Sequence, residues 1–243
     1  MTVKFHSESI SYSEFYYVLF HESLAFSYKW CDYSFHTCPI PKYFVLSPLQ
    51  PDTLKDLEQK IRSFTPVSDS DMEFGLQFYK KETFKKGEFL VQPGQYIQDF
   101  YFMKQGCVTF YSIEEGITRV MEFYTDGSFF TDLYPYIEEI PSESYLEVTE
   151  DTVVYTITKS DALKVFDHSH ALERFGRLSM QKAFINNFQR INRMKNLSNQ
   201  ERYLQLLEKR PSLFQRVPQY LIASYLGLTP VGLSKIRKRL SKQ

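Results

Sequence analysis

The sequence predicts an α+β protein in which an antiparallel β-roll of the jelly-roll kind is followed by a long helix and a small helical bundle. Three observations support this prediction. Short strand-like runs between residues 81 and 158 are separated by glycine corners, residues 160–195 have a helical period, and residues 198–243 fit three short helices. Hydrophobic residues make up 43% of the 243 residues and charged residues 24%, which excludes a chain disordered throughout.

The first segment, residues 1–50, is predicted to be an N-terminal extension of uncertain order. Residues 1–46 carry many aromatic side chains, no glycine and no clear period, and a translation start further along the chain is an alternative interpretation. Cys31, His36 and Cys38 are residue types that bind zinc. Their spacing matches no common structural zinc site and a fourth ligand is missing, so no metal site is predicted.

Residues 51–168 are predicted to form the β-roll domain, which begins with two short helices. Leu54, Leu57 and Ile61 are spaced for one helix face, and a second helix fits residues 69–78 with Ser68 or Ser70 near its start. The strand-like runs that follow are residues 89–91, 100–103, 108–111, 120–124, 145–148 and 153–157. Glycines at positions 87, 94, 106, 116 and 127 mark turns between them, as in an antiparallel barrel or jelly roll.

Residues 169–196 are predicted to form one long helix with an apolar stripe. The stripe has steps of three or seven residues, which keep its members near one face, and consists of Leu172, Phe175, Leu178, Ile185, Phe188 and Ile191. A stripe of this length has to be covered by other apolar groups. The β-roll of the same chain or a second copy of the helix can provide that cover, and the period does not choose between them.

Residues 197–243 are predicted to contain a helix-turn-helix. Ser198 and Glu201 fit a capping box at the start of the first helix. The second helix spans about residues 218–226 and ends at Gly227, and the third begins at Thr229-Pro230 and ends at about residue 240. A small residue for close helix crossing, a glycine turn and apolar docking residues are the parts that such a motif needs, and here they are Ala223, Gly227, Leu233 and Ile236.

The charge is distributed very unevenly along the chain although the net charge is zero. Residues 171–243 hold 15 Lys and Arg against 3 Asp and Glu, whereas residues 1–170 hold 14 against 26. This asymmetry indicates an anionic partner, with double-stranded DNA favoured over an anionic membrane surface. The alternative is that the basic part packs on the acidic part of the same chain. The DNA-contacting residues predicted in the last helix are Thr229, Ser234, Lys235, Arg237, Lys238 and Arg239.

The order of these parts and three stretches of sequence resemble the cyclic-AMP receptor protein and FNR (Crp/Fnr) family of bacterial regulators. The stretches are FKKGEFL at 84–90, ASYLGLTP at 223–230 and LSKIRKRL at 233–240, and they look most like the branch common in Bacteroidetes. The resemblance covers residues 53–240. It implies a homodimer through the long helix at Leu178, Ile185, Phe188 and Ile191, a small-molecule pocket in a cyclic-nucleotide-binding-like β-roll, operator binding and RNA polymerase as a partner.

Two departures from the family pattern affect these implications. In members that bind cyclic nucleotides, a Gly-Glu-Leu element and a later Arg-Ser or Arg-Thr pair hold the ribose and the phosphate. Here they correspond to Thr131-Asp132-Leu133 and Ser142-Glu143, so the phosphate loses its cation. We therefore expect an effector other than a cyclic nucleotide, or none. Val231-Gly232 occupy positions where base-reading polar residues are expected, so a ligand-sensing module without sequence-specific DNA output is the alternative.

An enzyme is not predicted, and neither is a cofactor. A metal-dependent enzyme of related fold would need histidines inside the barrel, and none of the five histidines lies between residues 81 and 158. The sequence also has no phosphate-binding glycine motif and no G-x-S-x-G element. It has no run of about 18 apolar residues and does not start with a secretory signal, so a cytoplasmic protein without a membrane partner is expected.

Overall fold

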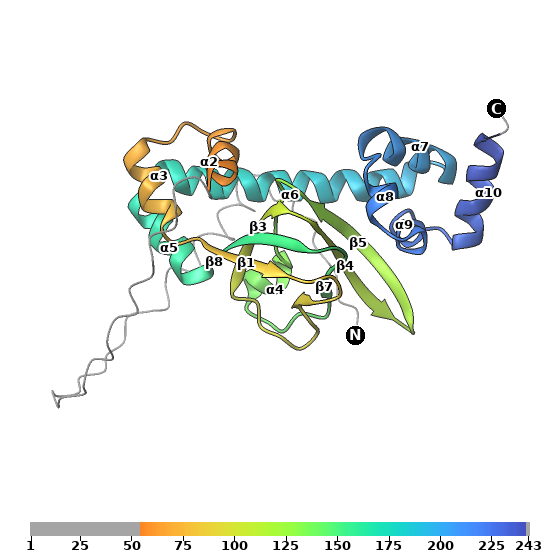
Figure 1. Ribbon diagram of the computed structural model, residues 1–243, viewed down its shortest axis with the longest axis horizontal. Coiled ribbons are helices and arrows are strands. Elements are labelled where there is room, and N and C mark those ends of the chain that lie inside the picture. The colour runs from red at the N-terminus through yellow and green to blue at the C-terminus, as the bar shows by residue number, and fades with distance from the viewer. Residues whose placement is uncertain (1–53, 242–243) are drawn as a thin grey trace, which may run out of the picture. The chain divides into compact units, whose positions relative to one another are not determined.

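The computed structural model describes residues 54–241, and these residues contain two antiparallel sheets, a long helix and two groups of short helices (Figure 1). The predicted α+β class with an antiparallel β-roll is confirmed. The N-terminal extension, including Cys31, His36 and Cys38, lies outside the described residues.

Two short helices precede the sheets. Helix α2 spans Lys55–Arg62 and buries Leu57 and Ile61, while Leu54 is its N-cap residue. Helix α3 spans Asp69–Leu76, and the Ser68 hydroxyl accepts a hydrogen bond from the Asp71 N–H at its start. That bond satisfies one of the amides that a helix start leaves free, which is why a serine is favoured there.

The sheets are built from eight strands, in the orders β1-β8-β3-β6 and β2-β7-β4-β5. The strands are β1 Lys80–Phe84, β2 Phe89–Val91, β3 Asp99–Gln105, β4 Cys107–Glu114, β5 Ile117–Thr125, β6 Phe129–Phe130, β7 Tyr145–Val148 and β8 Thr152–Thr158. Two of them, β1 and β6, were not among the predicted runs. β1 has the mostly exposed sequence KKETF and β6 has two residues, so neither carries an apolar period that could indicate a strand.

The predicted glycine corners are real turns, and Gly106 shows why the residue is needed. Its φ is +124°, and an added Cβ would lie 2.2 Å from the Thr152 hydroxyl and 2.8 Å from the Thr152 Cα. Positive φ strains any other residue, and the second contact is with backbone that cannot move aside. The chain therefore turns between β3 and β4 only because residue 106 has no side chain.

Helix α5 spans Lys159–His168 and helix α6 spans His170–Asn196. The hydroxyl of Thr158 caps α5, two residues before the predicted start of the helical period at residue 160, and that of Ser169 caps α6. The apolar stripe of α6 is divided between two environments. Leu172 and Phe175 are buried against α2, α3 and α5, Leu178 is half-buried, and Ile185, Phe188 and Ile191 are exposed.

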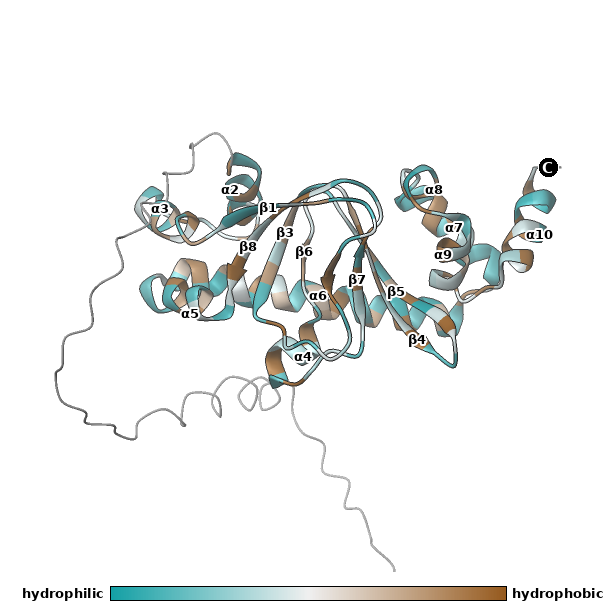
Figure 2. Ribbon diagram, turned by 60° about the horizontal axis from the view of Figure 1, so that its bottom comes forward, coloured by the Kyte–Doolittle hydropathy of each residue, from teal (hydrophilic) through white to brown (hydrophobic). Residues whose placement is uncertain are grey.

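The residues after α6 form four helices, where three were predicted. They are α7 Asn199–Lys209, α8 Leu213–Arg216, α9 Gln219–Tyr225 and α10 Pro230–Leu240 (Figure 2). The missed helix, α8, is a single turn between Pro211 and Pro218, too short to show a period. The predicted capping box of Ser198 and Glu201 is present at the start of α7, and Thr229 caps α10 with Pro230 in its first turn.

Candidate effector pocket and nucleic-acid interface

The predicted pocket residues meet in the β-roll beside helix α4, which spans Leu133–Glu138. Asp132 and Ser142 are both buried, and the Ser142 hydroxyl donates a 2.7 Å hydrogen bond to the Asp132 carboxylate. The same Ser142 oxygen accepts a bond from the Ser144 N–H. The two side chains at which the family pattern would bind ribose and phosphate are therefore bound to each other.

The other pocket candidates do not add a cation. Thr131 is buried and donates to the Asp99 carbonyl at 3.0 Å. Leu133 is half-buried at the first turn of α4, and Glu143 is exposed. The structure thus brings Asp132 and Ser142 together but leaves Glu143 in solvent.

The burial of Asp132 raises the pKa of its carboxyl group, and the bond from Ser142 only partly opposes this shift. An ionised carboxylate loses hydration when it is buried, so its charged form is disfavoured. A second negative group nearby, such as a phosphate, would make the ionised form of Asp132 still less favourable. The electrostatics at Asp132 therefore disfavour an anionic ligand.

Aromatic side chains fill the interior of the β-roll next to this pair. The Phe130 ring stacks on Tyr124 with centroids 4.7 Å apart and on Tyr101 at 5.3 Å. Tyr136 of α4 lies in the same buried cluster as Phe130. Such a stack leaves little room for a purine ring without displacement of aromatic groups.

At the other end of the chain, α9 and α10 form a helix–turn–helix pair. Gly227 has a φ of +67°, and the Leu228 N–H bonds the Ala223 carbonyl at 2.8 Å, which closes the end of α9. Leu233 and Ile236 of α10 are buried against α9 and its neighbours. The predicted docking residues therefore hold the motif together.

The predicted DNA-contacting side chains lie on the solvent side of α10. Ser234, Lys235, Arg237 and Lys238 are exposed. The Thr229 hydroxyl accepts a bond from the Gly232 N–H, so it serves the helix cap. Arg239 is also exposed, but its guanidinium donates to the Gln200 side chain of α7.

Within residues 54–241, no group of three His, Cys, Asp or Glu side chains is arranged to hold a metal ion. In the same range, no helix has the length and apolar character needed to cross a membrane.

Comparison with known proteins agrees with this architecture. Residues 81–169 match the family model of the cyclic nucleotide-binding domain. FixK2 from Bradyrhizobium japonicum has a TM-score of 0.59 and 18% identity, over 68% of this chain and 85% of that one. CLP, the c-di-GMP responsive global regulator of Xanthomonas campestris, has a TM-score of 0.57 and 19% identity, over 72% of this chain and 92% of that one. No curated protein sequence matches the chain.

The chain has the Crp/Fnr fold. CprK, solved as a complex with OCPA, gives a further likeness, with a TM-score of 0.53 and 18% identity over 72% of this chain and 84% of that one. The shares of this chain that these matches cover are larger than the range of the domain match.

In this Crp/Fnr fold, the helical bundle covers the open edge of the sheet at β5, the last strand of its sheet. The Ser224 hydroxyl of α9 accepts from the Val120 N–H at 3.0 Å and donates to the Thr118 carbonyl at 2.7 Å. Arg190 of α6 donates to the Val120 carbonyl. Side chains therefore satisfy backbone groups that an edge strand would otherwise leave free.

Arginines of the basic region also pair with acidic groups of the β-roll. Arg210 donates to the Glu122 carboxylate at 2.6 Å and to the Phe123 carbonyl at 2.5 Å. Arg216 pairs with Asp126 and Glu150. The alternative interpretation of the basic region, that it packs on its own acidic part, thus holds for these arginines. No local pattern could predict these pairs, since the partners are 66 to 90 residues away.

Proposed function

We propose that the protein is a homodimeric DNA-binding transcriptional regulator of the Crp/Fnr type that acts in the cytoplasm. Its division would be an extension at 1–50, a sensor at 51–168, a dimerisation helix at 169–196 and a DNA-binding domain at 197–243. The observation that carries the proposal is α10 itself. Its apolar side is buried through Leu233 and Ile236, and its opposite side presents Ser234, Lys235, Arg237 and Lys238 to solvent.

Physical fit to duplex DNA supports this use of α10. A major groove admits one α-helix, and its phosphate walls attract cations. The helix ends in Arg237, Lys238 and Arg239, while its first turn has no acidic residue. Lys235 and Ser234 would reach base edges, and Val231, which is 65% exposed, would offer an apolar contact such as a thymine methyl group accepts.

The regulator would work as a dimer through the exposed part of the α6 stripe, and RNA polymerase would be its further partner. The proposed role of the β-roll is to sense an effector that is not a cyclic nucleotide, or to serve as a scaffold without an effector. The hydrogen bond between Asp132 and Ser142 supports this role, because Ser142 stands where the family pattern has the cation and its hydroxyl is already bonded to Asp132. The protein would not be an enzyme. The protein would belong to the branch of the family that is common in Bacteroidetes.

Salt-dependent DNA binding tests the function. We expect the purified protein to protect a near-palindrome with half-sites about one helical turn apart in genomic footprinting. Replacing Arg237 and Lys238 with alanine should lower the slope of log affinity against log salt by about 0.9 for each lost phosphate contact. The matched control replaces Lys85 and Lys86, two exposed lysines of the β-roll, and should leave the slope unchanged.

Two results would contradict the proposal. An equal decrease of the salt slope in the variant that lacks Lys85 and Lys86 would mean that net charge alone drives binding. Absence of any protected site, with weak binding to every duplex, would favour the alternative of a ligand-sensing module without sequence-specific DNA output.

A further inference from the structure

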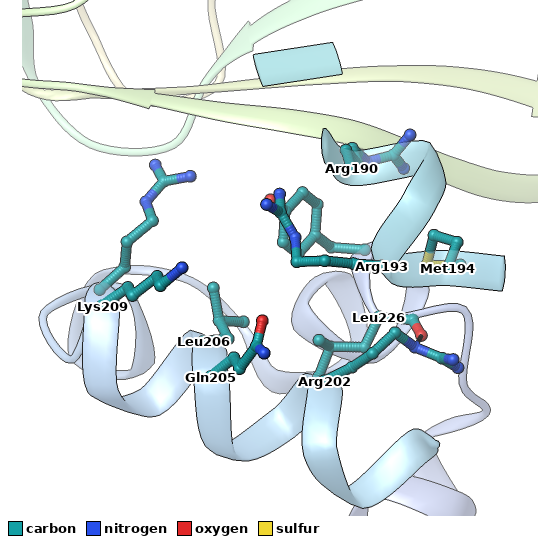
Figure 3. A pocket seen from close by; sticks show the side chains of 10 residues that line it. Arg190, Arg193, Met194, Arg202, Gln205, Leu206, Lys209 and Leu226 are labelled. Carbon is teal, nitrogen blue, oxygen red and sulfur yellow. Dashed lines mark hydrogen bonds between the residues drawn. The ribbon is translucent and has the colours of Figure 1, made fainter. Parts of the chain in front are cut away.

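A hollow lined with cations lies where helix α6 meets the C-terminal bundle (Figure 3). Its cavity volume is about 90 Å³, and its walls come from α6, α7 and the end of α9. Five positively charged side chains line it and no carboxylate does: Arg190, Arg193, Arg202, Lys209 and Arg210. Like charges that converge on one space without an anion repel one another, so the arrangement favours an anionic occupant.

Most of this charge is not neutralised by the protein. Arg210 is paired with Glu122. Arg202 donates only to neutral acceptors, the carbonyls of Leu197 and Leu226 and the Asn199 side chain.

The other three cations, Arg190, Arg193 and Lys209, have fewer hydrogen-bond partners than Arg202. Among the described residues, the side chains of Arg193 and Lys209 make no hydrogen bond or ion pair. Arg190 donates one bond to the Val120 carbonyl, and its Nε is buried without any hydrogen-bond partner. A buried donor without an acceptor is costly, so an oxyanion that reached it would gain a charge-assisted bond.

The floor of the hollow is apolar and aromatic. Leu206, Tyr225 and Leu226 line it and are buried, and the Arg190 guanidinium lies 5.4 Å from the centre of the Tyr225 ring. A ligand that fits therefore has an apolar part as well as a charged group. We propose that this hollow binds a small phosphate ester, with its phosphate among Arg190, Arg193 and Lys209 and its apolar part on Tyr225 and Leu206.

A phosphate ester suits the site better than a single carboxylate. Its charge at neutral pH is close to −2, because its second pKa is about 6, so it can balance more than one cation. Guanidinium groups also present forked donors that match phosphate oxygens. DNA backbone phosphate is the less favoured occupant, since no lining residue belongs to α10 and the site is recessed between helices.

Binding itself does not depend on the proposed function, but its consequence does. Lining residues come both from α6, which continues from the β-roll, and from the bundle that carries α10. An occupant would bridge the two and so would alter how firmly the bundle is held. Calorimetric binding and DNA binding are separate measurements, so failure of one proposal can be told from failure of the other.

Isothermal titration calorimetry on the full chain tests the proposal with three probes. Phenyl phosphate carries both features, inorganic phosphate lacks the apolar part and phenol lacks the charge. We expect phenyl phosphate to bind more tightly than either of the others. Arg193→Gln should weaken it by about tenfold or more, the effect of losing one charged hydrogen bond. Because the Arg193 side chain makes no hydrogen bond to any residue that the structure describes, the variant should keep the wild-type unfolding temperature.

The matched control is Arg174→Gln, which removes the same charge from an exposed position on the same helix and should leave affinity unchanged. Equal affinity for phenol and phenyl phosphate, or an equal loss in both variants, would overturn the proposal. So would no binding of phenyl phosphate at millimolar concentration. If in that case Arg193→Gln lowered the salt slope of DNA binding by about 0.9, the cations would belong to the DNA interface instead.

Discussion

Arg216 of helix α8 donates a 2.5 Å hydrogen bond to the Glu150 carboxylate, which lies in the turn before β8. The same guanidinium pairs with Asp126 at 3.0 Å and donates to the Gly106 carbonyl at 2.6 Å. One side chain of the bundle thus joins three turns of the β-roll. The hydrogen bond to Glu150 and the neighbouring Asp126 carboxylate raise the pKa of Arg216 above its ordinary value.

The first prediction concerns this arginine. Arg216→Ala should lower the free energy of unfolding by about 2 kcal/mol, because it leaves partly buried carboxylates without their donor. Chemical denaturation measures the change. Lys85→Ala is the matched control, since Lys85 pairs with Asp151 at an exposed position and should have a much smaller effect. Equal stability of Arg216→Ala and wild type would show that α8 is not held by these contacts.

Features of the fold that depend on a few neighbouring residues could be predicted from the sequence. Ser198 and Glu201 form their capping box within one turn, and Gly106 and Gly227 adopt positive φ where a corner or turn was expected. These are local requirements, set by free helix amides and by backbone sterics. They can be recognised without knowledge of the tertiary structure.

Features that depend on distant residues could not be predicted. The bonds of Ser224 to β5 and of Arg216 to Glu150 join positions far apart in the sequence, and no period or spacing relates them. The candidate pocket was predicted only through the family resemblance. That comparison located Asp132 and Ser142 but could not show that the two side chains bond to each other and that Phe130 fills the adjacent interior.

The second prediction is dimerisation through the exposed end of the α6 stripe. Phe184 and Phe188 are 57% and 55% exposed, a large apolar surface for one helix face. Phe188→Glu should yield a monomer, because each buried and unpaired charge costs about 3–5 kcal/mol. Light scattering at micromolar concentration gives the mass. The control is Leu163→Glu, an equally exposed leucine on α5, which should remain dimeric. A monomeric wild type would refute the proposed dimer.

The third prediction concerns pH and Asp132. Its folded pKa is raised by burial above the unfolded value of about 3.9. In acid, Asp132 is protonated in both states. As the pH rises from the unfolded pKa through the folded pKa, the folded state holds more protons, so this group reduces stability. The difference in free energy of unfolding between Asp132→Asn and wild type should therefore shift in favour of the variant as the pH rises.

A control of opposite sign is available at Asp151. Lys85 and the Lys86 N–H lower the pKa of this carboxyl, so it contributes stability above its unfolded pKa and loses that contribution in acid. The free energy of unfolding of Asp151→Asn should thus fall relative to that of the wild type as the pH rises. Denaturant titrations over a range of pH would reveal both trends. A pH-independent difference for Asp132→Asn would mean that its carboxyl is well solvated.

The last prediction is that neither cyclic AMP nor cyclic GMP binds the β-roll with useful affinity. A cyclic phosphate in a pocket with little water needs a cation or several donors, and each charged hydrogen bond contributes about 1.5–3 kcal/mol. The position of that cation holds Ser142, whose hydroxyl is already bonded to Asp132. Calorimetry on the wild type should show no binding. A dissociation constant in the low micromolar range would contradict the prediction.

A double substitution, Ser142→Arg with Glu143→Ser, distinguishes the two physical causes of this loss. If the missing cation were the sole cause, the variant should regain affinity. We expect no recovery, because the new guanidinium would lie beside the buried Asp132 carboxylate and pair with it. The stacked rings of Tyr101, Tyr124 and Phe130 also pack the adjacent interior and would have to move to admit a base. An unchanged unfolding temperature would confirm that the variant is folded. Binding by the folded variant would instead show that these aromatic side chains move aside and that the phosphate cation alone was lost.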